Sequence, residues 1–463
     1  MKVKVLQQLP LPLILLCVVL IAGCTKENTI ALQDEQPLNL KVMYFNEDQF
    51  LQDYGNLFLL QKPNIKIEVA STQSLSRTPD PVAAFDELVE KEKPDVILLN
   101  SSNFKTYAAE EKLMELDSLI ERDQYDTETI YPALIDLLRK DGNGKLYGLS
   151  PTFGQSVVFY NADLFKKYGI ELPHDGMTWE NIYDLARRFP AEGAENTRVY
   201  GYGEQYAMNM NSIVQNMART EGIMMVNPNT LEVTINTESW RKLYQLVLDG
   251  RKSNAVYIPE QNGSKRVVTA EDQYKKQPFI MGRQAMVVGG PNILEQIKEA
   301  ETTIQNYKPF EVGMATGPVN TADPERSSTF YLYQIMAISA NSPNAEAAWE
   351  FIQFANGEEY AKNKSKSMSN GLLLSRMGTY QDSEGYSMDV FYKLKPNMDR
   401  FNYLEEFERI PAAFNIGLIP IVDKEIDLVI ENKKSLSEAL QTAQKEGQEL
   451  MDKALKEESK SKK

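Results

Sequence analysis

The sequence predicts an α/β fold built as two lobes, with several chain crossovers acting as a hinge between them. Two β-rich regions, near residues 38–99 and 310–340, are separated by a largely helical block. Within the first region, strand and helix patterns alternate, which is typical of a parallel, doubly wound sheet. A chain that leaves one domain and later returns to it makes two lobes, so the second β-rich region is expected to rejoin the first.

The first β-rich region contains three predicted strands. Leu38–Phe45 and Ile65–Val69 alternate apolar and polar side chains with a period of two, which indicates strands with one buried face. A helical pattern follows over Pro81–Lys91, and Val96–Leu99 is then entirely apolar. An entirely apolar strand is expected inside a parallel sheet covered on both faces.

The middle of the chain is predicted to be mostly helical. Thr178 is placed to cap a helix that begins at Trp179, because apolar side chains then recur at helical spacing. Thr237 is placed to cap a second helix, which Gly250 is expected to end.

Three further signals organise the C-terminal part. Phe330–Ile338 is predicted to be a strand, and Ser342-Pro343 has the residue types of a helix start. Ser435 and Glu438 have the spacing of a capping box at the start of a long final helix.

Composition excludes several function classes. Among 463 residues, Asp and Glu number 65 and Lys and Arg 50, for a net charge of −15; this argues against a nucleic-acid partner. The single histidine, His174, excludes paired-histidine metal sites, and two cysteines are too few for a thiolate cluster. The sequence therefore predicts no metal and no cofactor.

The first residues have the pattern of an export signal. A short positive start precedes the apolar run Leu11–Ile21, and Ile21-Ala22-Gly23-Cys24 resembles the lipobox of bacterial lipoproteins. The resemblance implies a signal peptide over 1–23, a diacylglyceryl group on Cys24 and a polar tether over 24–37. We therefore expect a protein anchored by lipid on the extracytoplasmic face of the cell membrane. An uncleaved anchor or an ordinary signal peptide is the alternative.

Five segments follow one another in a recognisable order. They are Lys93–Asn100, Gly144–Pro151, Phe159–Ile170 with Met177–Trp179, Phe279–Pro291 and Ala347–Ile352. Together they resemble extracellular solute-binding protein family 1, which includes maltodextrin-binding proteins. The resemblance implies a two-lobed, type II periplasmic-binding-protein-like fold. By the same resemblance, lobe 1 would hold residues 38–150 plus 317–370, and lobe 2 would hold 151–316 plus 371–463.

The resemblance also implies a function. The protein would capture a carbohydrate-type ligand, an oligosaccharide or a glycoside, by hinge closure and deliver it to the permease subunits of an ABC importer. It would act as a monomer without catalytic residues. Two alternatives stay open: a non-transporting surface receptor of the same fold, and a surface enzyme acting on glycans with two carboxylates.

The chain departs from the family pattern at one informative position. Many sugar-binding relatives carry Trp after a Gly-Pro pair, whereas here Asn292 follows Gly290-Pro291. The three tryptophans all lie on apolar helical faces and are expected in the core: Trp179, Trp240 and Trp349. Stacking on a sugar ring must then come from Tyr or Phe. The ligand class, whether neutral sugar, acidic sugar or peptide, stays open.

Candidate ligand-binding residues follow from where ligands bind in α/β sheets, beyond the carboxyl ends of the strands. In the first β-rich region these positions are Tyr44, Phe45, Asn46, Glu47, Ser71, Asn100 and Ser101. The remaining candidates are Phe153, Gln155, Tyr202, Tyr206, Asn211, Gly290, Pro291, Asn292 and Tyr331. The alternatives are burial for Tyr44 and Phe45, turn chemistry for the Asn and Ser residues, and a hairpin with surface tyrosines for 200–206.

Overall fold

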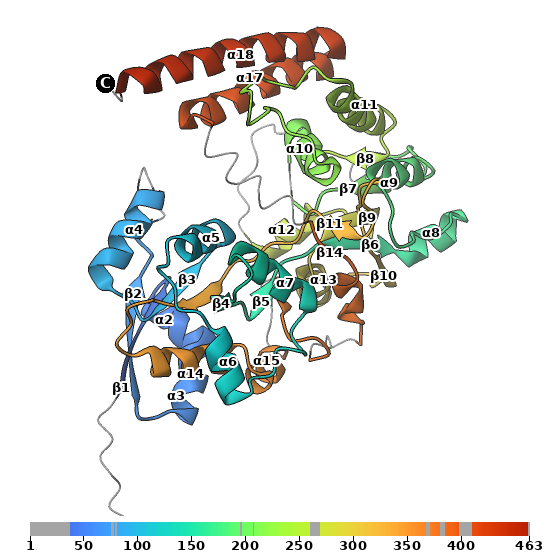
Figure 1. The fold of residues 1–463 in the computed structure, drawn as a ribbon. Coiled ribbons are helices and arrows are strands. Elements are labelled where there is room, and N and C mark those ends of the chain that lie inside the picture. Colours follow the sequence, from blue (N-terminus) through green and yellow to red (C-terminus); the bar gives the residue numbers. More distant parts are fainter. Residues whose placement is uncertain are drawn as a thin grey trace, which may run out of the picture.

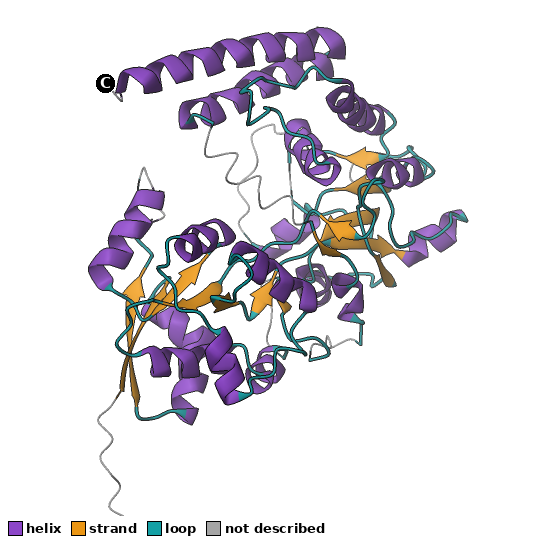
Figure 2. Ribbon diagram, in the orientation of Figure 1, coloured by secondary structure: helices purple, strands orange, loops and turns teal. Residues whose placement is uncertain are grey.

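A computed structural model describes residues 38–75, 78, 81–194, 197–206, 208–259, 269–366, 371–379, 385–397 and 410–461. The predicted signal peptide, Cys24 and the tether lie outside these residues. In the described part, the strands form two separate five-stranded sheets, each with its own helices (Figures 1 and 2). The predicted α/β, two-lobed fold is confirmed.

The first sheet has the strand order β2-β1-β3-β12-β4. Its strands are β1 (Leu38–Tyr44), β2 (Ile65–Ser71), β3 (Val96–Leu99), β4 (Gly148–Leu149) and β12 (Ile335–Ile338). The first three are parallel, and β12 returns from far along the chain to pair antiparallel with both β3 and β4. Its helical segments are α2 (Glu47–Phe50), η1 (Leu51–Gly55), α3 (Asn56–Gln61), α4 (Pro81–Glu92), α5 (Ser101–Ala109), α6 (Asp117–Asp123), α7 (Pro132–Asp141), α14 (Ala345–Ala355) and α15 (Glu358–Lys364).

The second sheet has the strand order β10-β6-β9-β7-β8. Its strands are β6 (Val157–Asn161), β7 (Tyr200–Gly203), β8 (Val256–Tyr257), β9 (Gln284–Gly289) and β10 (Val312–Ala315). Its helices are α8 (Ala162–Tyr168), α9 (Trp179–Ala186), α10 (Met210–Glu221), α11 (Glu238–Lys252), α12 (Ala270–Lys275) and α13 (Asn292–Thr303). The C-terminal helices α17 (Ala412–Ile430) and α18 (Leu436–Ser461) pack on α10 and α11 (Figure 1).

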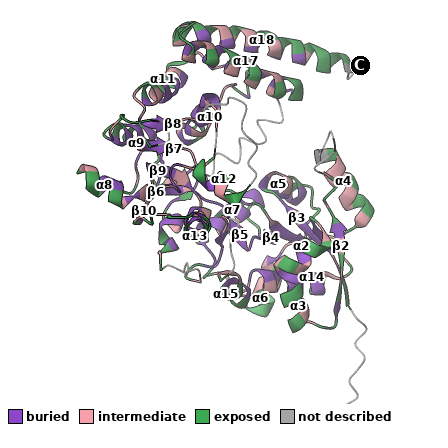
Figure 3. Ribbon diagram, turned by 180° about the vertical axis from the view of Figure 1, so that it is seen from behind, coloured by how far each residue is buried: buried purple, intermediate pink, exposed green. Residues whose placement is uncertain are grey.

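Two apolar clusters form the core. One spans the first sheet, the crossovers and one face of the second sheet, and the other joins the opposite face of the second sheet to α17 and α18. Figure 3 shows inner strands such as β3 and β9 buried in both lobes, while the outer faces of α4 and α18 are exposed. No helix within the described residues is both long and apolar enough to cross a bilayer.

Three segments run between the two sheets and meet one another. β5 (Thr152–Phe153) pairs with β13 (Leu373–Leu374), and Gly154 forms a bridge with Tyr331 of the segment 316–334. Beyond them, β11 (Arg326–Ser327) pairs with β14 (Lys395–Pro396), which follows the 3₁₀ helix η3 (Met388–Tyr392). These paired segments form the connection about which the lobes would move.

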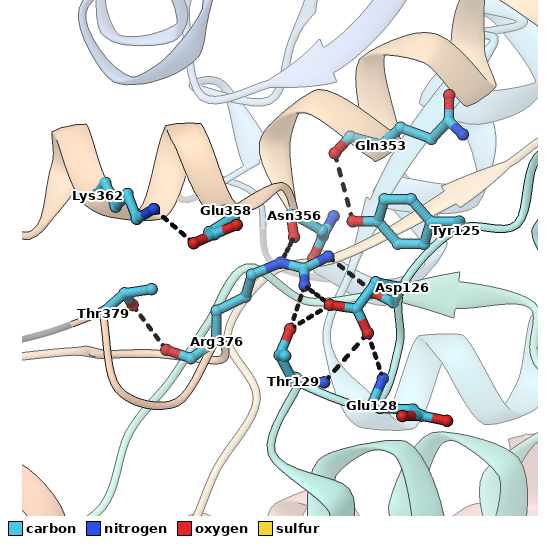
Figure 4. A network of polar contacts seen from close by, with 10 residues as sticks. All are labelled: Tyr125, Asp126, Glu128, Thr129, Gln353, Asn356, Glu358, Lys362, Arg376 and Thr379. Carbon is cyan, nitrogen blue, oxygen red and sulfur yellow. Dashed lines mark hydrogen bonds and ion pairs between the residues drawn. The ribbon is translucent and has the colours of Figure 1, made fainter.

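Arg376 fixes the segment that contains β13 to the first lobe (Figure 4). The side chain is only 4% exposed, and its guanidinium donates to the carbonyl of Asn356 at 2.6 Å and to the carbonyl and carboxylate of Asp126 at 2.8 and 2.9 Å. It also donates to the Thr129 hydroxyl and lies over the Tyr125 ring at 5.3 Å. Residues 371–379 are thus tied to the first lobe, although the predicted division places 371–463 in the second; the lobe boundaries stay a prediction.

Two predicted helix starts are confirmed. At α9, the Thr178 hydroxyl accepts from the backbone N–H of Asn181, whose side chain accepts in return from the N–H of Thr178. At α18, Ser435 and Glu438 make the same reciprocal bonds.

Gly250 does not end its helix, since α11 continues to Lys252. A Cβ on Gly250 would lie 2.6 Å from Val256 and 3.0 Å from the Tyr183 ring. The glycine therefore serves close packing of α11 against the second sheet rather than helix termination.

Two predictions near residues 330–345 are also corrected. Only residues 335–338 form a strand, because 330–334 belong to the crossover that bridges to Gly154. The helix starts at Ala345 rather than at Ser342-Pro343. The Ser342 hydroxyl instead donates to the buried carboxylate of Asp95 at 2.6 Å, which holds this loop out of the helix.

Candidate ligand-binding site

Three tyrosines lie together where the crossovers meet the second lobe. Tyr206, Tyr331 and Tyr333 are 52%, 46% and 62% exposed, unusually high for aromatic side chains. Partial burial raises the pKa of the Tyr331 hydroxyl, and the neighbouring phenols of Tyr206 and Tyr333 raise it further. The hydroxyl groups of Tyr206 and Tyr333 therefore lie close enough to that of Tyr331 to influence it, and the three rings are exposed to solvent.

Asn292, which follows Gly290-Pro291, joins this cluster. Its amide donates to the Tyr206 hydroxyl at 3.1 Å. Its side-chain oxygen would lie only 3.0 Å from a Cβ on Gly371, so the amide fills the space between the two loops. Asn292 thus holds Tyr206 in place rather than offering a ring of its own.

Gly154 provides the surface on which Tyr331 rests. A Cβ at this position would lie 2.0 Å from the Tyr331 ring, and the two residues exchange backbone hydrogen bonds of 2.9 Å. Only glycine, which has no side chain, lets the Tyr331 ring lie this close to the backbone. The first crossover therefore positions an aromatic side chain of the second.

A pocket of about 270 Å³ opens beside Tyr206. This volume is close to the roughly 300 Å³ at the lower end of small-molecule sites and suits one sugar ring. Its lining comes from the crossovers, the ends of β7 and β9, the start of α9, and α10: Ser156, Trp179, Glu204, Gln205, Tyr206, Met208, Asn216, Arg219, Thr220, Val288, Gly289, Ser328 and Thr329. The hydroxyls of Thr220 and Ser328, 3.0 Å apart, join α10 to the crossover within this lining.

Glu204 is the acidic group in this pocket. The Tyr202 hydroxyl donates a hydrogen bond to the Glu204 carboxylate at 2.8 Å. Burial raises the pKa of the Glu204 carboxyl to about 7. The hydrogen bond from Tyr202 lowers this pKa, but its effect is smaller than that of burial. Near neutral pH this carboxyl is therefore present in both forms, and its protonated form is a hydrogen-bond donor.

Replacing Glu204 by glutamine is expected to stabilise the protein at pH 8 and to change little at pH 4. The folded-state pKa is raised, so stability falls as pH rises from about 4.5 to about 7 and is constant above. The full shift corresponds to at most about 3 kcal/mol, or roughly 3 °C in Tm for a chain of this size. Thermal unfolding at both pH values tests this, with Glu121→Gln on an exposed helix as control. An equal shift at both pH values would refute it.

The predicted residues of the first lobe mostly serve turns and helix starts. Asn46 and Asn100 cap α2 and α5 by accepting from the N–H groups of Gln49 and Asn103 at 2.8 and 2.9 Å. The Ser71 hydroxyl donates to the carbonyl of Phe45. Exposed side chains that remain available at this edge are Phe45, Glu47, Ser71 and Asn100, whereas Ser101 is buried.

Five other predicted residues are buried and held by the protein itself. The Tyr44 hydroxyl donates to Asp53, and Phe153 stacks between Tyr131 and Phe330. Tyr202, Gln155 and Asn211 are also buried, and Asn211 donates to Asp423 at 2.8 Å. The hairpin with surface tyrosines is wrong, because β7 is an inner strand that pairs parallel with β8 and β9. We leave these five side chains out of the proposed contacts.

Sequence reasoning missed Tyr333, and it did not single out Glu204 and Gln205 within the candidate stretch 200–206. A signal for Tyr333 was present, since Phe330, Tyr331, Leu332 and Tyr333 alternate; the first and third are buried and the tyrosines exposed. Within the described residues, no three His, Cys, Asp or Glu side chains are grouped so that they could hold a metal ion.

Two α/β lobes, three paired crossovers and a small pocket with exposed aromatic rings beside it define a two-lobed solute-binding protein. Residues 59–390 match the family model described as bacterial extracellular solute-binding protein, and the chain belongs to that family. The predicted resemblance is confirmed.

A curated relative is the arabinooligosaccharide-binding protein of Bacillus subtilis (strain 168), 26% identical over 180 residues, which are 38% of this chain and 40% of the relative. The match thus spans less than half of that protein.

Solved structures resemble the chain over nearly its whole length. The extracellular solute-binding protein family 1 member from Alicyclobacillus acidocaldarius is 15% identical with a TM-score of 0.59, covering 89% of this chain and 98% of that one. The sugar-binding protein MalE from Xanthomonas citri is 15% identical with a TM-score of 0.58, covering 90% and 97%. An ABC substrate-binding protein from Listeria monocytogenes, in complex with cycloalternan, is 20% identical with a TM-score of 0.51, covering 90% and 98%. At such identities the likeness shows the fold alone.

Proposed function

We propose that this protein captures a carbohydrate-type ligand, an oligosaccharide or glycoside, and delivers it to the permease subunits of an ABC importer. The exposed cluster of Tyr206, Tyr331 and Tyr333 carries the proposal. Aromatic faces bury the apolar face of a sugar ring, while nearby amides and hydroxyls bind its hydroxyl groups. The named ligands of the relatives, arabinooligosaccharide and cycloalternan, support the same class.

Hinge closure would couple binding to delivery. Tyr206 belongs to the second lobe, whereas Tyr331 and Tyr333 stand on the crossover that leads into β12 of the first lobe. A ligand that contacts both sides favours whichever arrangement brings them together. The closed form would then be the one that the permease recognises.

A thermal-shift panel on a soluble form that starts at Thr25 tests the ligand class. The panel holds neutral oligosaccharides, including malto- and arabinooligosaccharides, uronic-acid oligomers, amino sugars and short peptides. A ligand at 100 times its Kd adds about 2.7 kcal/mol, which raises Tm by roughly 3 °C here. Stabilisation by one or more carbohydrates supports the proposal. Stabilisation by peptides alone, or by no carbohydrate at millimolar concentration, would overturn it.

We also propose that lipid on Cys24 anchors the protein to the membrane after removal of residues 1–23. The Cys24→Ser variant is expected to lose incorporation of labelled palmitate in a bacterial host, because the acyl transfer needs the thiol. Cys17→Ser changes the other cysteine and is the matched control, which should label normally. Undiminished labelling of the Cys24→Ser variant would contradict the proposal.

A further inference from the structure

The pocket beside Tyr206 contains more hydrogen-bond donors than the protein uses. The indole N–H of Trp179 and the side-chain amide N–H of Gln205 are buried and have no partner within the described residues. Trp179 is only 3% exposed, so solvent does not satisfy its N–H. A buried donor without a partner is costly unless a ligand provides an acceptor.

Arg219 adds a cation to the same lining. Its guanidinium donates to the neutral side chain of Asn216 at 3.1 Å, and no carboxylate partner is found for it within the described residues. An arginine without a carboxylate partner keeps its full positive charge. It leaves positive charge available to a ligand.

Glu204, the acidic group of the pocket, is only partly ionised at neutral pH. Burial raises the pKa of its carboxyl to about 7. Its protonated form donates a hydrogen bond and so adds to the donors of Trp179, Gln205 and Arg219 rather than repelling an anion.

We infer that this pocket is a subsite for an acidic sugar unit whose carboxylate is received by Arg219, Trp179 and Gln205. The inference rests on the proposed function and narrows its ligand from carbohydrates in general to uronic-acid-containing ones. The volume of about 270 Å³ suits one ring, and Tyr206 at its border offers that ring an aromatic face. Both oxygens of a carboxylate accept hydrogen bonds, which matches the excess of donors in the pocket. A neutral hydroxyl also donates a hydrogen bond, so it needs an acceptor from the protein as well.

The test compares each uronic-acid trimer with its own methyl ester, which keeps the ring and removes the charge. Galacturonate, glucuronate and mannuronate trimers are titrated calorimetrically into the wild type. At least one free acid is expected to bind 10-fold or more tightly than its ester, because charge-assisted hydrogen bonds are lost in the ester. Equal affinity of every acid and ester would overturn the inference.

Arg219→Gln provides the second arm, with Arg188→Gln, an exposed arginine outside the pocket, as control. Arg219→Gln is expected to abolish the preference for the free acid over its ester. Its Tm should be unchanged, because the Arg219 side chain is exposed. Arg188→Gln is expected to keep the preference. Retention of the preference in Arg219→Gln contradicts the assignment, as does tighter binding of sulfated sugars than of uronates. If neutral oligosaccharides bind and uronates do not, this inference fails while the proposed function stands.

Discussion

Replacing Tyr206 by alanine is expected to weaken binding of the carbohydrate that the panel identifies by about 10- to 100-fold. The ring is half exposed, is held by the Asn292 amide, and belongs both to the tyrosine cluster and to the lining of the pocket. Loss of an aromatic contact at the centre of a binding site typically costs about 1.5–3 kcal/mol. Isothermal titration calorimetry of both proteins measures the change.

Tyr206→Phe is the matched control for this prediction. It keeps the ring and removes only the hydroxyl that accepts from Asn292. We expect a loss of no more than about 5-fold, the value of one partly exposed hydrogen bond. Unchanged affinity of Tyr206→Ala would show that the exposed tyrosines do not form the binding surface.

Replacing Arg376 by methionine is expected to cause the largest loss of stability, about 2–4 kcal/mol, or roughly 2–4 °C in Tm. Methionine fills much of the volume but leaves the carbonyls of Asn356 and Asp126 without their donor. Because Asp126 is half exposed, most of the cost comes from these carbonyls and not from an unpaired charge. Differential scanning calorimetry measures it.

Arg326 offers a comparison of the same chemistry at the surface. It pairs with Asp323 at 3.1 Å, and both side chains are well exposed. Exposed pairs contribute about 0–1 kcal/mol, so Arg326→Met is expected to shift Tm by no more than about 1 °C. Similar losses in the two variants would contradict the role given to the buried network.

The elements predicted from the sequence were those that depend on local chemistry. Strands β1 and β2 follow from side-chain alternation and β3 from an unbroken apolar run. The starts of α9 and α18 follow from capping residues that bond within three positions. Predictions failed where a distant residue decides the outcome. Val256 and Tyr183 explain Gly250, and Asp95, almost 250 positions away, holds Ser342 out of its helix.

The residues of the candidate site also divide into those that a local pattern predicts and those that depend on distant contacts. Tyr206 could be proposed because aromatic and glycine residues cluster near it in the sequence, and Asn292 because it follows the glycine pair in a loop that matches the family. Tyr44, Phe153 and Tyr202 have equally aromatic surroundings, yet they are buried. Local pattern does not tell which aromatic ring points inward. It also does not tell that folding buries Glu204, which is what raises the pKa of its carboxyl.

The central claim is that a carbohydrate closes two lobes around the crossovers. Small-angle X-ray scattering of the wild type, with and without the ligand identified by the panel, tests it most directly. We expect a smaller radius of gyration with saturating ligand, and no change for Tyr206→Ala at a concentration that saturates only the wild type. Saturable binding in calorimetry with unchanged scattering would contradict closure as the mechanism.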